Sequence, residues 1–314
     1  MATVFKKTLH ELGNGDYAYV QHDGSWGWSN SGLVTDGERA LLVDTLFDLR
    51  LTREMLESYK RAVPGVEPID ILVNTHANGD HTFGNQLFPG AQIIASGGCA
   101  EEMFDLVPEY LTGLTKRTGQ LGEYARYILG PFDFNDITVT VPNRTFDGEL
   151  RLKVGNKEVR LIEVGPAHTR GDTIVWVPAD RVVYTADILF IGGHPIIWAG
   201  PVSNWLRALD LIIGLDVETI VPGHGPLTDK AHVRELKGYF EYLDREARAR
   251  YESGMNRLDA ARDISLADYS TWGEAERIVA NVDALYHEYS GAPRLSRDEL
   301  FAQMAEFDHA RRKT

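Results

Sequence analysis

The chain of 314 residues has one cysteine, few positive charges and no long apolar run. The lone cysteine, Cys99, has no partner for a disulfide within the chain, as is typical of proteins from a reducing compartment. A membrane-spanning helix needs roughly 18 apolar residues in succession, and no stretch approaches that length. The first residues carry two lysines with no apolar stretch behind them, so we expect no secretory signal. These absences predict a cytoplasmic protein without a membrane partner.

Positive charge is scarce as well. Lysine and arginine together number 32, against 46 aspartates and glutamates, and the formal net charge is -14. Proteins that bind phosphate backbones need clustered lysines and arginines. We therefore expect no nucleic-acid partner and a small-molecule substrate instead. The sequence leaves open whether the chain forms a homo-oligomer.

The remaining composition is that of a globular α+β protein. Hydrophobic residues make up 43% of the chain and charged residues 25%, which is ordinary for a folded domain. Short β-branched runs bounded by Gly, Pro, Asn or Asp predict strands up to about residue 227. Helical patterns interrupt these strands at 49–62, 97–129 and 203–214. We predict a core domain over 1–227, with a helical insert at 97–135, and a helical C-terminal extension over 228–314.

Residues 74–85 read NTHANGDHTFGN and carry four side chains with nitrogen or oxygen donors. These donors are His76, Asn78, Asp80 and His81. They follow the apolar run IDILVNT, so we expect them in a loop at the end of a strand. Four further strand-like runs end in a histidine or an aspartate, and these residue types are ligands that zinc prefers. The four residues are Asp44, His168, Asp187 and His224.

The order of these residues resembles the metallo-β-lactamase superfamily, whose pattern is Asp, HxHxDH, His, Asp, His at similar spacings. A single histidine or aspartate at a strand end is more often a turn former, but the whole set in this order is hard to attribute to chance. The match covers residues 15–228. It implies an αββα sandwich with metals at one edge. The phrases HTFGNQLF, VGPAHTRGD and PGHGP look similar to the branch that contains polyketide cyclase/thioesterases.

The resemblance implies two metal sites that share one carboxylate. Carried onto this sequence, its ligands are His76, His168 and position 78 for site one, Asp80, His81 and His224 for site two, and Asp187 between the two. Asp44 matches a position that supports the ligand loop through hydrogen bonds and does not itself bind metal. Asp80 also matches a catalytic position, where it would orient or deprotonate the attacking water.

Asn78 stands where the family has a histidine. An amide nitrogen is not a metal ligand, and an amide oxygen is a weaker donor for zinc than a histidine nitrogen. The asparagine side chain is also shorter than that of a histidine that binds through Nε2. Its oxygen therefore contacts the metal only through a water molecule that fills the gap. We therefore expect Zn2+ as the cofactor, as one or two ions, with site one weakened. A single zinc still activates water near neutral pH, so this change does not exclude hydrolysis.

Two apolar segments rich in aromatic residues, 100–135 and 190–205, lie between the ligand-bearing strands. Family members place elements that cover the substrate at these points. We predict that the substrate-binding residues are Tyr127, Ile197 and Trp198. Other candidates, for which packing onto the core is the alternative, are Trp26, Trp28 and His194.

The predicted function is hydrolysis, by a metal-bound hydroxide, of a thioester, ester or lactone whose acyl part is apolar or aromatic. Three alternatives remain. The chain could be a polyketide-type cyclase/thioesterase, a mononuclear-iron oxidoreductase, or a non-catalytic binding protein whose site has decayed at position 78. The oxidoreductase ranks low because no flavin domain is recognisable. A fold by itself does not decide among these functions.

Overall fold

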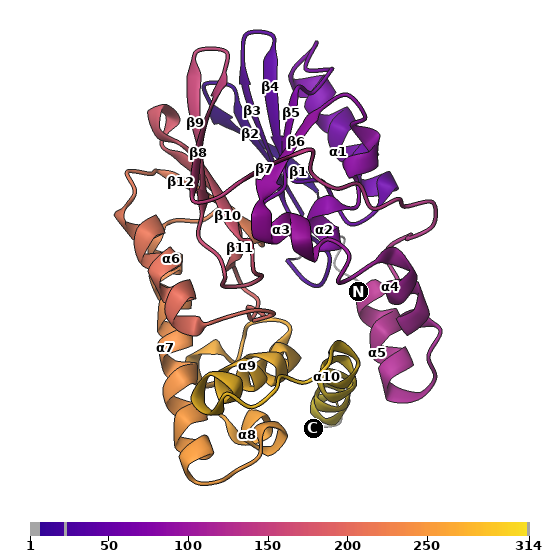
Figure 1. Ribbon diagram of the computed structural model, residues 1–314, viewed down its shortest axis with the longest axis vertical. Coiled ribbons are helices and arrows are strands. Elements are labelled where there is room, and N and C mark those ends of the chain that lie inside the picture. Colours follow the sequence, from indigo (N-terminus) through magenta and orange to yellow (C-terminus); the bar gives the residue numbers. More distant parts are fainter. Residues whose placement is uncertain (1–6, 22–23, 313–314) are drawn as a thin grey trace.

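A computed structural model describes residues 7–21 and 24–312 as two mixed β-sheets that lie face to face, with helices on their outer sides (Figure 1). One sheet has seven strands and the other has five. Helices also follow the second sheet in the sequence and gather at one end of the sandwich (Figure 1). The predicted α+β class and αββα architecture are confirmed.

The seven-stranded sheet runs in sequence order from β1 to β7. Its strands are β1 (Thr8–Gly13), β2 (Asp16–Val20), β3 (Ser31–Asp36), β4 (Arg39–Val43), β5 (Ile71–Val73), β6 (Gln92–Ser96) and β7 (Arg144–Phe146). The first four pair antiparallel, and β4 to β7 pair parallel. Parallel neighbours need a crossover connection, and a helix supplies the one from β4 to β5.

That crossover helix is α1 (Leu49–Ala62), which has the bounds predicted from the sequence. Asp48 caps its first turn by accepting a hydrogen bond of 2.6 Å from the backbone nitrogen of Leu51. Leu51, Met55 and Tyr59 follow at four-residue spacing and are fully buried in the core that includes strands of this sheet. This single apolar face fixes the helix against the sheet.

The five-stranded sheet has the order β12-β11-β10-β9-β8. Its strands are β8 (Glu149–Val154), β9 (Lys157–Glu163), β10 (Thr173–Val177), β11 (Val182–Phe190) and β12 (Thr219–His224). All neighbours pair antiparallel except β11 and β12, which are parallel. β11 lies between β12 and β10 in the sheet, and all nine of its residues are buried, so both faces of this strand are covered.

The two sheets share one apolar layer. Val34, Leu41 and Val73 of the first sheet belong to the same buried cluster as Val175 and Val221 of the second. Each valine or leucine fully buried in this way stabilises the fold by about 1.5–3 kcal/mol. This layer holds the strand ends, and therefore the loops that follow them, in fixed positions.

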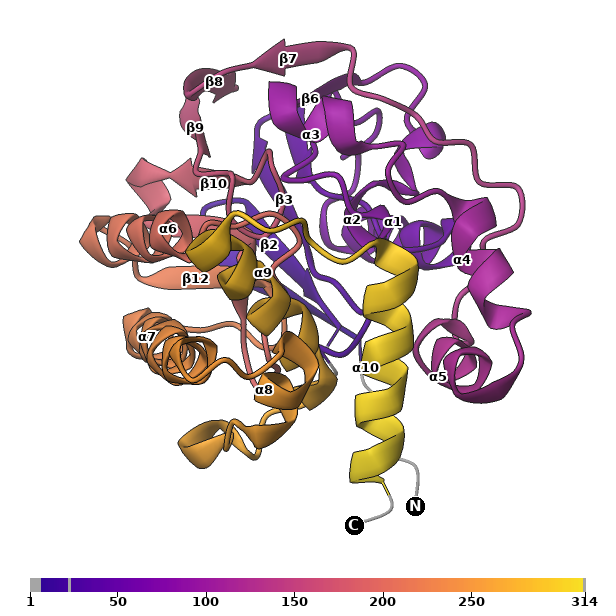
Figure 2. The same ribbon diagram turned by 60° about the horizontal axis from the view of Figure 1, so that its bottom comes forward.

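Helices after β6 form the predicted insert, and further helices form the C-terminal region. The insert contains α3 (Gly97–Glu102), α4 (Pro108–Thr115) and α5 (Gly119–Leu129). α6 (Val202–Gly214) lies between β11 and β12. The helices of the C-terminal region are α7 (Lys230–Glu252), α8 (Arg257–Asp263), α9 (Ile278–Ser290) and α10 (Arg297–Arg311). α10 lies beside α5, so the C-terminal helices contact the insert (Figure 2). The division into two domains at residue 227 stays a prediction.

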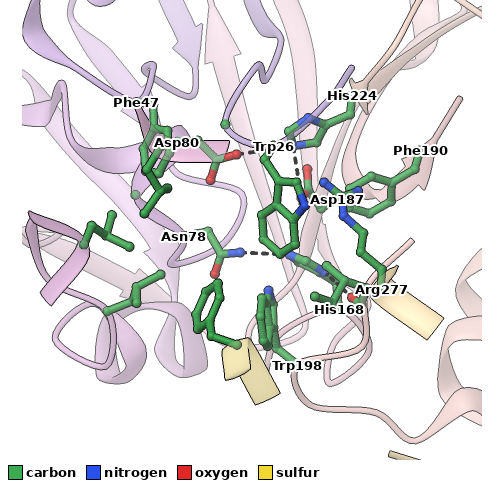
Figure 3. Close-up of a pocket in the computed structure, with 17 residues that line it drawn as sticks. Trp26, Phe47, Asn78, Asp80, His168, Asp187, Phe190, Trp198, His224 and Arg277 are labelled. Carbon is green, nitrogen blue, oxygen red and sulfur yellow. Dashed lines mark hydrogen bonds and ion pairs between the residues drawn. The ribbon is translucent and has the colours of Figure 1, made fainter. Parts of the chain in front are cut away.

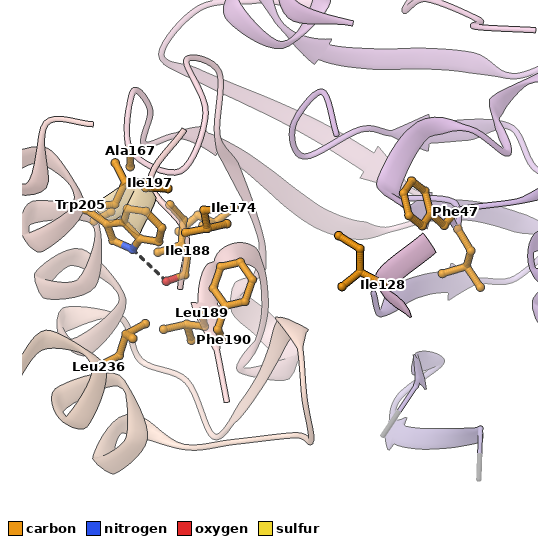
Figure 4. Close-up of a cluster of buried hydrophobic side chains, with 14 of the residues drawn as sticks. Phe47, Ile128, Ala167, Ile174, Ile188, Leu189, Phe190, Ile197, Trp205 and Leu236 are labelled. Carbon is orange, nitrogen blue, oxygen red and sulfur yellow. Dashed lines mark hydrogen bonds between the residues drawn. The ribbon is translucent and has the colours of Figure 1, made fainter. Parts of the chain in front are cut away.

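Trp205 anchors α6 to the second sheet. Its side chain is fully buried, and its Nε1 donates a hydrogen bond of 3.0 Å to the carbonyl of Ile188 in β11 (Figure 4). Its ring also packs against Phe240 of α7, with the ring centroids 4.6 Å apart.

Among the residues that the structure describes, no helix combines the length and the apolar character needed to cross a bilayer.

Candidate metal centre

Loops and strand ends at one edge of the sandwich carry all the predicted donors. His76 follows β5, and Asp80 and His81 lie in the short helix α2 (Gly79–Thr82). His168 lies between β9 and β10. The remaining two donors lie on the second sheet, Asp187 within β11 and His224 as the last residue of β12. The parallel pairing of β11 with β12 places these two residues on neighbouring strands.

The donors form two buried groups. The first consists of His76, His168 and Asp187, and the second consists of Asp80, His81 and His224. Within each group the candidate ligand atoms lie within 4.8 Å of one another. Each group therefore has the residue types and the spacing of a three-ligand metal site.

Asp187 stands between the two groups. One of its oxygens lies 3.0 Å from Nε2 of His81. The other lies 3.3 Å from Nε2 of His168 and 3.4 Å from Nε2 of His224. Nε2 of His76 is 3.7 Å from the same oxygen. One carboxylate thus faces histidines of both groups, as a carboxylate that bridges two ions must.

Unsatisfied polar atoms test whether the residues fit a metal ion. Nε2 of His76 is buried without a hydrogen-bond partner among the described residues. Nε2 of His81 and Oδ1 of Asp187 are also buried, and although they lie 3.0 Å apart, neither atom makes a hydrogen bond of good geometry in the described structure. A buried polar atom without a partner is costly, and a divalent cation satisfies both nitrogen lone pairs and carboxylate oxygens. These atoms lie on the facing sides of the two groups. The residues therefore fit a binuclear metal centre.

Hydrogen bonds on the far side of the imidazoles orient them. Nδ1 of His81 lies 2.9 Å from Oδ2 of Asp44, and Nδ1 of His168 lies 2.8 Å from the carbonyl of Ile196. Asp44 also accepts hydrogen bonds from the backbone nitrogen of Thr75, at 2.8 Å, and from its hydroxyl, at 2.6 Å. Asp44 therefore holds the ligand loop and one imidazole together. Such partners fix which ring nitrogen is free to bind a metal.

Burial and charge divide the four histidines into two pairs with opposite pKa shifts. Burial lowers the pKa of His168 to about 4, and it lowers the pKa of His76 well below its usual value. Burial also acts on His224 and His81, but the surrounding carboxylates together outweigh it. Asp187 and Asp80 raise the pKa of His224 to about 9, and Asp187, Asp44 and Asp80 raise that of His81 well above its usual value. Protons on the second pair thus balance the carboxylates. Metal binding displaces such protons.

Glycine is required where β12 passes Asp187. A Cβ atom added to Gly223 would lie 2.0 Å from Oδ1 of Asp187 and 2.5 Å from the carbonyl carbon of Ala186. Neither neighbour is the far end of a flexible side chain. The absence of a side chain at position 223 therefore gives the bridging carboxylate its room.

Asn78 lies at the edge of the first group. It is the N-cap residue of α2, and its Nδ2 lies 3.0 Å from Nε2 of His168. Since Nδ1 of His168 faces a carbonyl, the amide donates its hydrogen bond to the lone pair that a metal would use. Asn78 is thus close to site one, but in this arrangement it competes for a ligand atom.

The metal centre opens into a pocket with apolar walls (Figure 3). Asp80, His168, Asp187 and His224 reach its surface, and Asn78 lies beside them. The apolar lining comes from the loops after β2 and β4, from the insert, from the end of β11 and the loop that follows it, and from the C-terminal helices. It consists of Trp26, Phe47, Leu106, Leu111, Leu129, Phe190, Ile196, Trp198 and Phe301.

Of the three predicted substrate-binding residues, the structure brings only Trp198 to this pocket. Ile197 is fully buried in the core, and its neighbour Ile196 lines the pocket instead. Tyr127 is 62% exposed and lies under the guanidinium of Arg312, away from the metal donors. Tyr127 and Ile197 therefore do not line this pocket, and their role in substrate binding stays a prediction. One turn of α5 and one residue of register decide which side chain faces the pocket.

Three other candidates are now placed. Trp26 lines the pocket, whereas Trp28 packs against Phe132 with the ring centroids 4.9 Å apart. Both follow β2 in a loop. His194 is buried between Tyr239 and other aromatic rings and does not line the pocket.

The sequence reasoning missed two lining residues of the C-terminal region, Arg277 and Phe301. Both lie more than 50 residues beyond the last metal donor. No local signal marks Arg277, because it ends the charged run GEAER before α9, and a run of this kind is usually exposed.

Comparisons with known proteins agree with this geometry. The family model described as "Metallo-beta-lactamase superfamily" matches residues 24–224. The chain is 27% identical over 224 residues to the 2,4-dinitroanisole O-demethylase subunit alpha of Nocardioides sp. (strain JS1661), covering 68% of this chain and 57% of that one. It is 23% identical to the metallo-beta-lactamase type 2 of Bacillus sp. (strain 170), covering 64% of this chain and 68% of that one.

Solved structures show the same fold. The stereoselective inverting sec-alkylsulfatase Pisa1 from Pseudomonas sp. aligns with a TM-score of 0.68 at 18% identity, covering 91% of this chain and 51% of that one. The metallo-beta-lactamase from Pontibacter korlensis aligns with a TM-score of 0.55 at 15% identity, covering 75% of this chain and 99% of that one. The alkylsulfatase alignment reaches into the C-terminal helices, because residues 1–227 alone cannot supply 91% of the chain. This chain spans about half the length of the first relatives in each comparison.

Proposed function

Because the chain belongs to the metallo-β-lactamase superfamily, we propose that it hydrolyses a thioester, ester or lactone bond in a substrate whose acyl part is apolar or aromatic. One observation carries this proposal: the two donor groups open into a pocket whose walls are almost entirely apolar. A pocket of this kind binds the body of a small molecule by burial and leaves its polar bond facing the polar groups. The names of the relatives denote an O-demethylase, a β-lactamase and an alkylsulfatase, so membership of the family does not choose the bond.

The cofactor that we propose is zinc, which histidine and carboxylate ligands suit. When bound, it supplies a Lewis acid that polarises the scissile bond and activates water near neutral pH. His76 and His168 would hold an ion in site one, and Asp80, His81 and His224 would hold one in site two. Asp187 would contact both.

Asp80 is the residue placed to move a proton. Its carboxylate lines the pocket, and its Oδ2 lies 3.3 Å from Nε2 of His224. The carboxylate therefore lies beside the other metal donors and at the pocket surface, and it could accept the proton that a water molecule bound there would lose. The apolar rings of the pocket exclude other water and hold the acyl part in place, which fixes the scissile bond beside Asp80.

A substrate panel tests the proposal. Zinc-loaded protein would be assayed with acyl thioesters, aryl and alkyl esters and lactones, with a phosphoester, a sulfate ester and a β-lactam as alternatives. We expect turnover of acyl substrates with bulky apolar groups, its loss on chelation, and its return with added zinc. Zinc-loaded protein that cleaves none of the acyl substrates, or that cleaves only one of the alternatives, would overturn the proposal.

Two variants locate the activity. Asp80→Ala and His224→Ala should each abolish turnover while circular dichroism stays unchanged, because neither side chain belongs to the apolar core. The matched controls are Asp268→Ala and His232→Ala, which change exposed residues outside the pocket. Activity in both site variants at the level of the controls would place the reaction elsewhere.

A further inference from the structure

Arg277 is a buried cation in the wall of the pocket. It ends the short helix η4 (Ala275–Arg277), directly before α9, and its side chain is 1% exposed. In Figure 3 its side chain lies with Phe190, His168 and Asp187 around the metal centre. Among the described side chains that line the pocket, it is the only charged one that is not a metal donor.

The guanidinium of Arg277 has few partners for a buried charge. Nη1 donates a hydrogen bond of 2.8 Å to the carbonyl of His194. Its Cζ lies 4.4 Å from the ring centroid of Trp26 and 5.3 Å from that of Phe190. Nε is buried without a hydrogen-bond partner in the described part of the chain. A guanidinium has five N–H donors, and within the described residues Arg277 donates only the one hydrogen bond to His194.

The adjacent carboxylate does not neutralise Arg277. Oε1 of Glu276 instead accepts hydrogen bonds from Nε1 of Trp26, at 2.8 Å, and from the hydroxyl of Tyr124, at 2.9 Å. Within residues 7–21 and 24–312, no carboxylate lies at ion-pair distance from the Arg277 guanidinium. Ring contacts and one carbonyl offset only part of the cost of burying a charge.

Another arginine of the same helical region shows the usual solution. Arg294 is also largely buried, and its Nε lies 2.6 Å from Oδ2 of Asp283. The carboxylate of Asp283 thus neutralises Arg294, which does not line the pocket. At Arg277 the chain supplies two aromatic rings, which hold the guanidinium in place without neutralising it. A charge held in this way lacks its counter-charge until a ligand brings one.

We propose that Arg277 binds an anionic oxygen group of the substrate, either a carboxylate or a sulfate-type group. The planar guanidinium matches a pair of such oxygens, and the rings of Trp26 and Phe190 fix its position before the ligand arrives. The apolar body of the substrate then lies along the remaining walls. This inference rests on the proposed function, because it names the substrate class as anions with an apolar or aromatic body.

Binding measurements test the proposal without turnover. The probes are benzoate, benzenesulfonate and benzamide, which share a ring and differ in charge. Zinc-loaded protein would be titrated by calorimetry and by tryptophan fluorescence, since two tryptophans line the pocket. We expect at least one anion to bind more tightly than neutral benzamide. Preference for benzoate indicates a carboxylate substrate, and preference for benzenesulfonate indicates a sulfate-type one.

Variants separate Arg277 from the metal as the anion receptor. Arg277→Gln should weaken the preferred anion by roughly 10- to 100-fold, as expected for a charge-assisted hydrogen-bonded pair, and should leave benzamide within about threefold. Arg277→Lys keeps the charge without the planar fork and should give an intermediate loss. The control is Arg234→Gln, which removes the same charge from an exposed arginine that also donates to a backbone carbonyl.

Three outcomes would overturn the proposal. These are equal affinity of the unaltered protein for the anions and benzamide, unchanged anion affinity in Arg277→Gln, and an equal loss of all three probes in a variant with normal zinc content. If the glutamine variant does not fold, the lysine variant and the comparison of probes on the unaltered protein still decide. Failure of the proposed hydrolysis would appear in the substrate panel and would leave these affinities measurable. Failure of the Arg277 proposal would leave turnover intact.

Discussion

His194 should make the fold less stable as the pH falls. The residue is fully buried, with its ring against Tyr239 and Trp272 at centroid distances of 5.4 and 5.6 Å. Its Nδ1 lies 2.8 Å from the carbonyl of Gly273, whereas its Nε2 is buried without a hydrogen-bond partner in the described structure. Burial lowers the pKa of His194 from 6.5 to about 4.

The size of the effect follows from the two pKa values. Between pH 6.5 and 4 the unfolded chain binds a proton at this position and the folded chain does not, so acid favours unfolding. The free energy of unfolding should therefore be fully retained above pH 6.5 and fall as the pH drops. The loss from this one group is about 2 kcal/mol at pH 5 and approaches about 3.4 kcal/mol below pH 4.

The variant His194→Phe isolates this contribution. Phenylalanine keeps a ring between the two aromatic neighbours but binds no proton, and the backbone carbonyl that Arg277 uses remains. Urea unfolding of metal-free protein at pH 7.5 and pH 5 gives the stability gap between the two proteins, and titration of the metal donors cancels in that gap. At pH 7.5 the variant should have the lower free energy of unfolding. Between pH 7.5 and pH 5 the difference between the two proteins should shift by about 2 kcal/mol in favour of the variant, because only the unaltered protein loses stability through His194. A gap that stays constant within about 0.5 kcal/mol would refute the assignment of a neutral His194.

Three further predictions concern the pocket. Gly223→Ala should displace the bridging carboxylate and lower zinc content and activity together. The control Gly214→Ala, whose added methyl group meets no atom within 4 Å, should change neither. Normal zinc content in the Gly223→Ala variant would contradict the close approach of Asp187. Asn78→His should raise zinc, measured by elemental analysis after dialysis, from nearer one ion per chain towards two, and two tightly held ions in the unaltered protein would contradict the weakened site. Trp198→Ala should lower kcat/KM for a bulky acyl ester by roughly 10- to 100-fold and barely affect an acetyl ester. Tyr127→Ala should affect neither ester, and an equal loss on both esters in the tryptophan variant would assign that residue to the fold.

The sequence predicted the metal donors well because each one follows a local signal. His76, Asp187 and His224 each stand at or near the end of an apolar run, and the fold brings such ends to one edge. The pocket wall has no such local signal. Whether Tyr127 or its neighbours on α5 face the pocket depends on how that helix meets α10, which is a contact between residues far apart in the sequence.

Arg277 illustrates the same limit. In the sequence it is one of many charges in a helical region, and an arginine in such a region is usually exposed. Its burial arises only when α9 packs beneath the metal centre and Trp26 closes over the guanidinium. Periodicity predicts the helix, but it does not predict that the residue before the helix will meet a loop from the start of the chain.

The metal donors and the outer pocket residues lie in different parts of the chain, and this has a consequence for how such proteins diverge. Every proposed metal ligand lies between residues 76 and 224, whereas Arg277 and Phe301 enter the pocket from the helices that follow. Substitutions in the later helices can therefore change which molecules are accepted without touching a single metal bond. An exchange of those helices between relatives would transfer selectivity and leave the reaction chemistry behind, so the reaction and its substrate range are free to evolve at different rates.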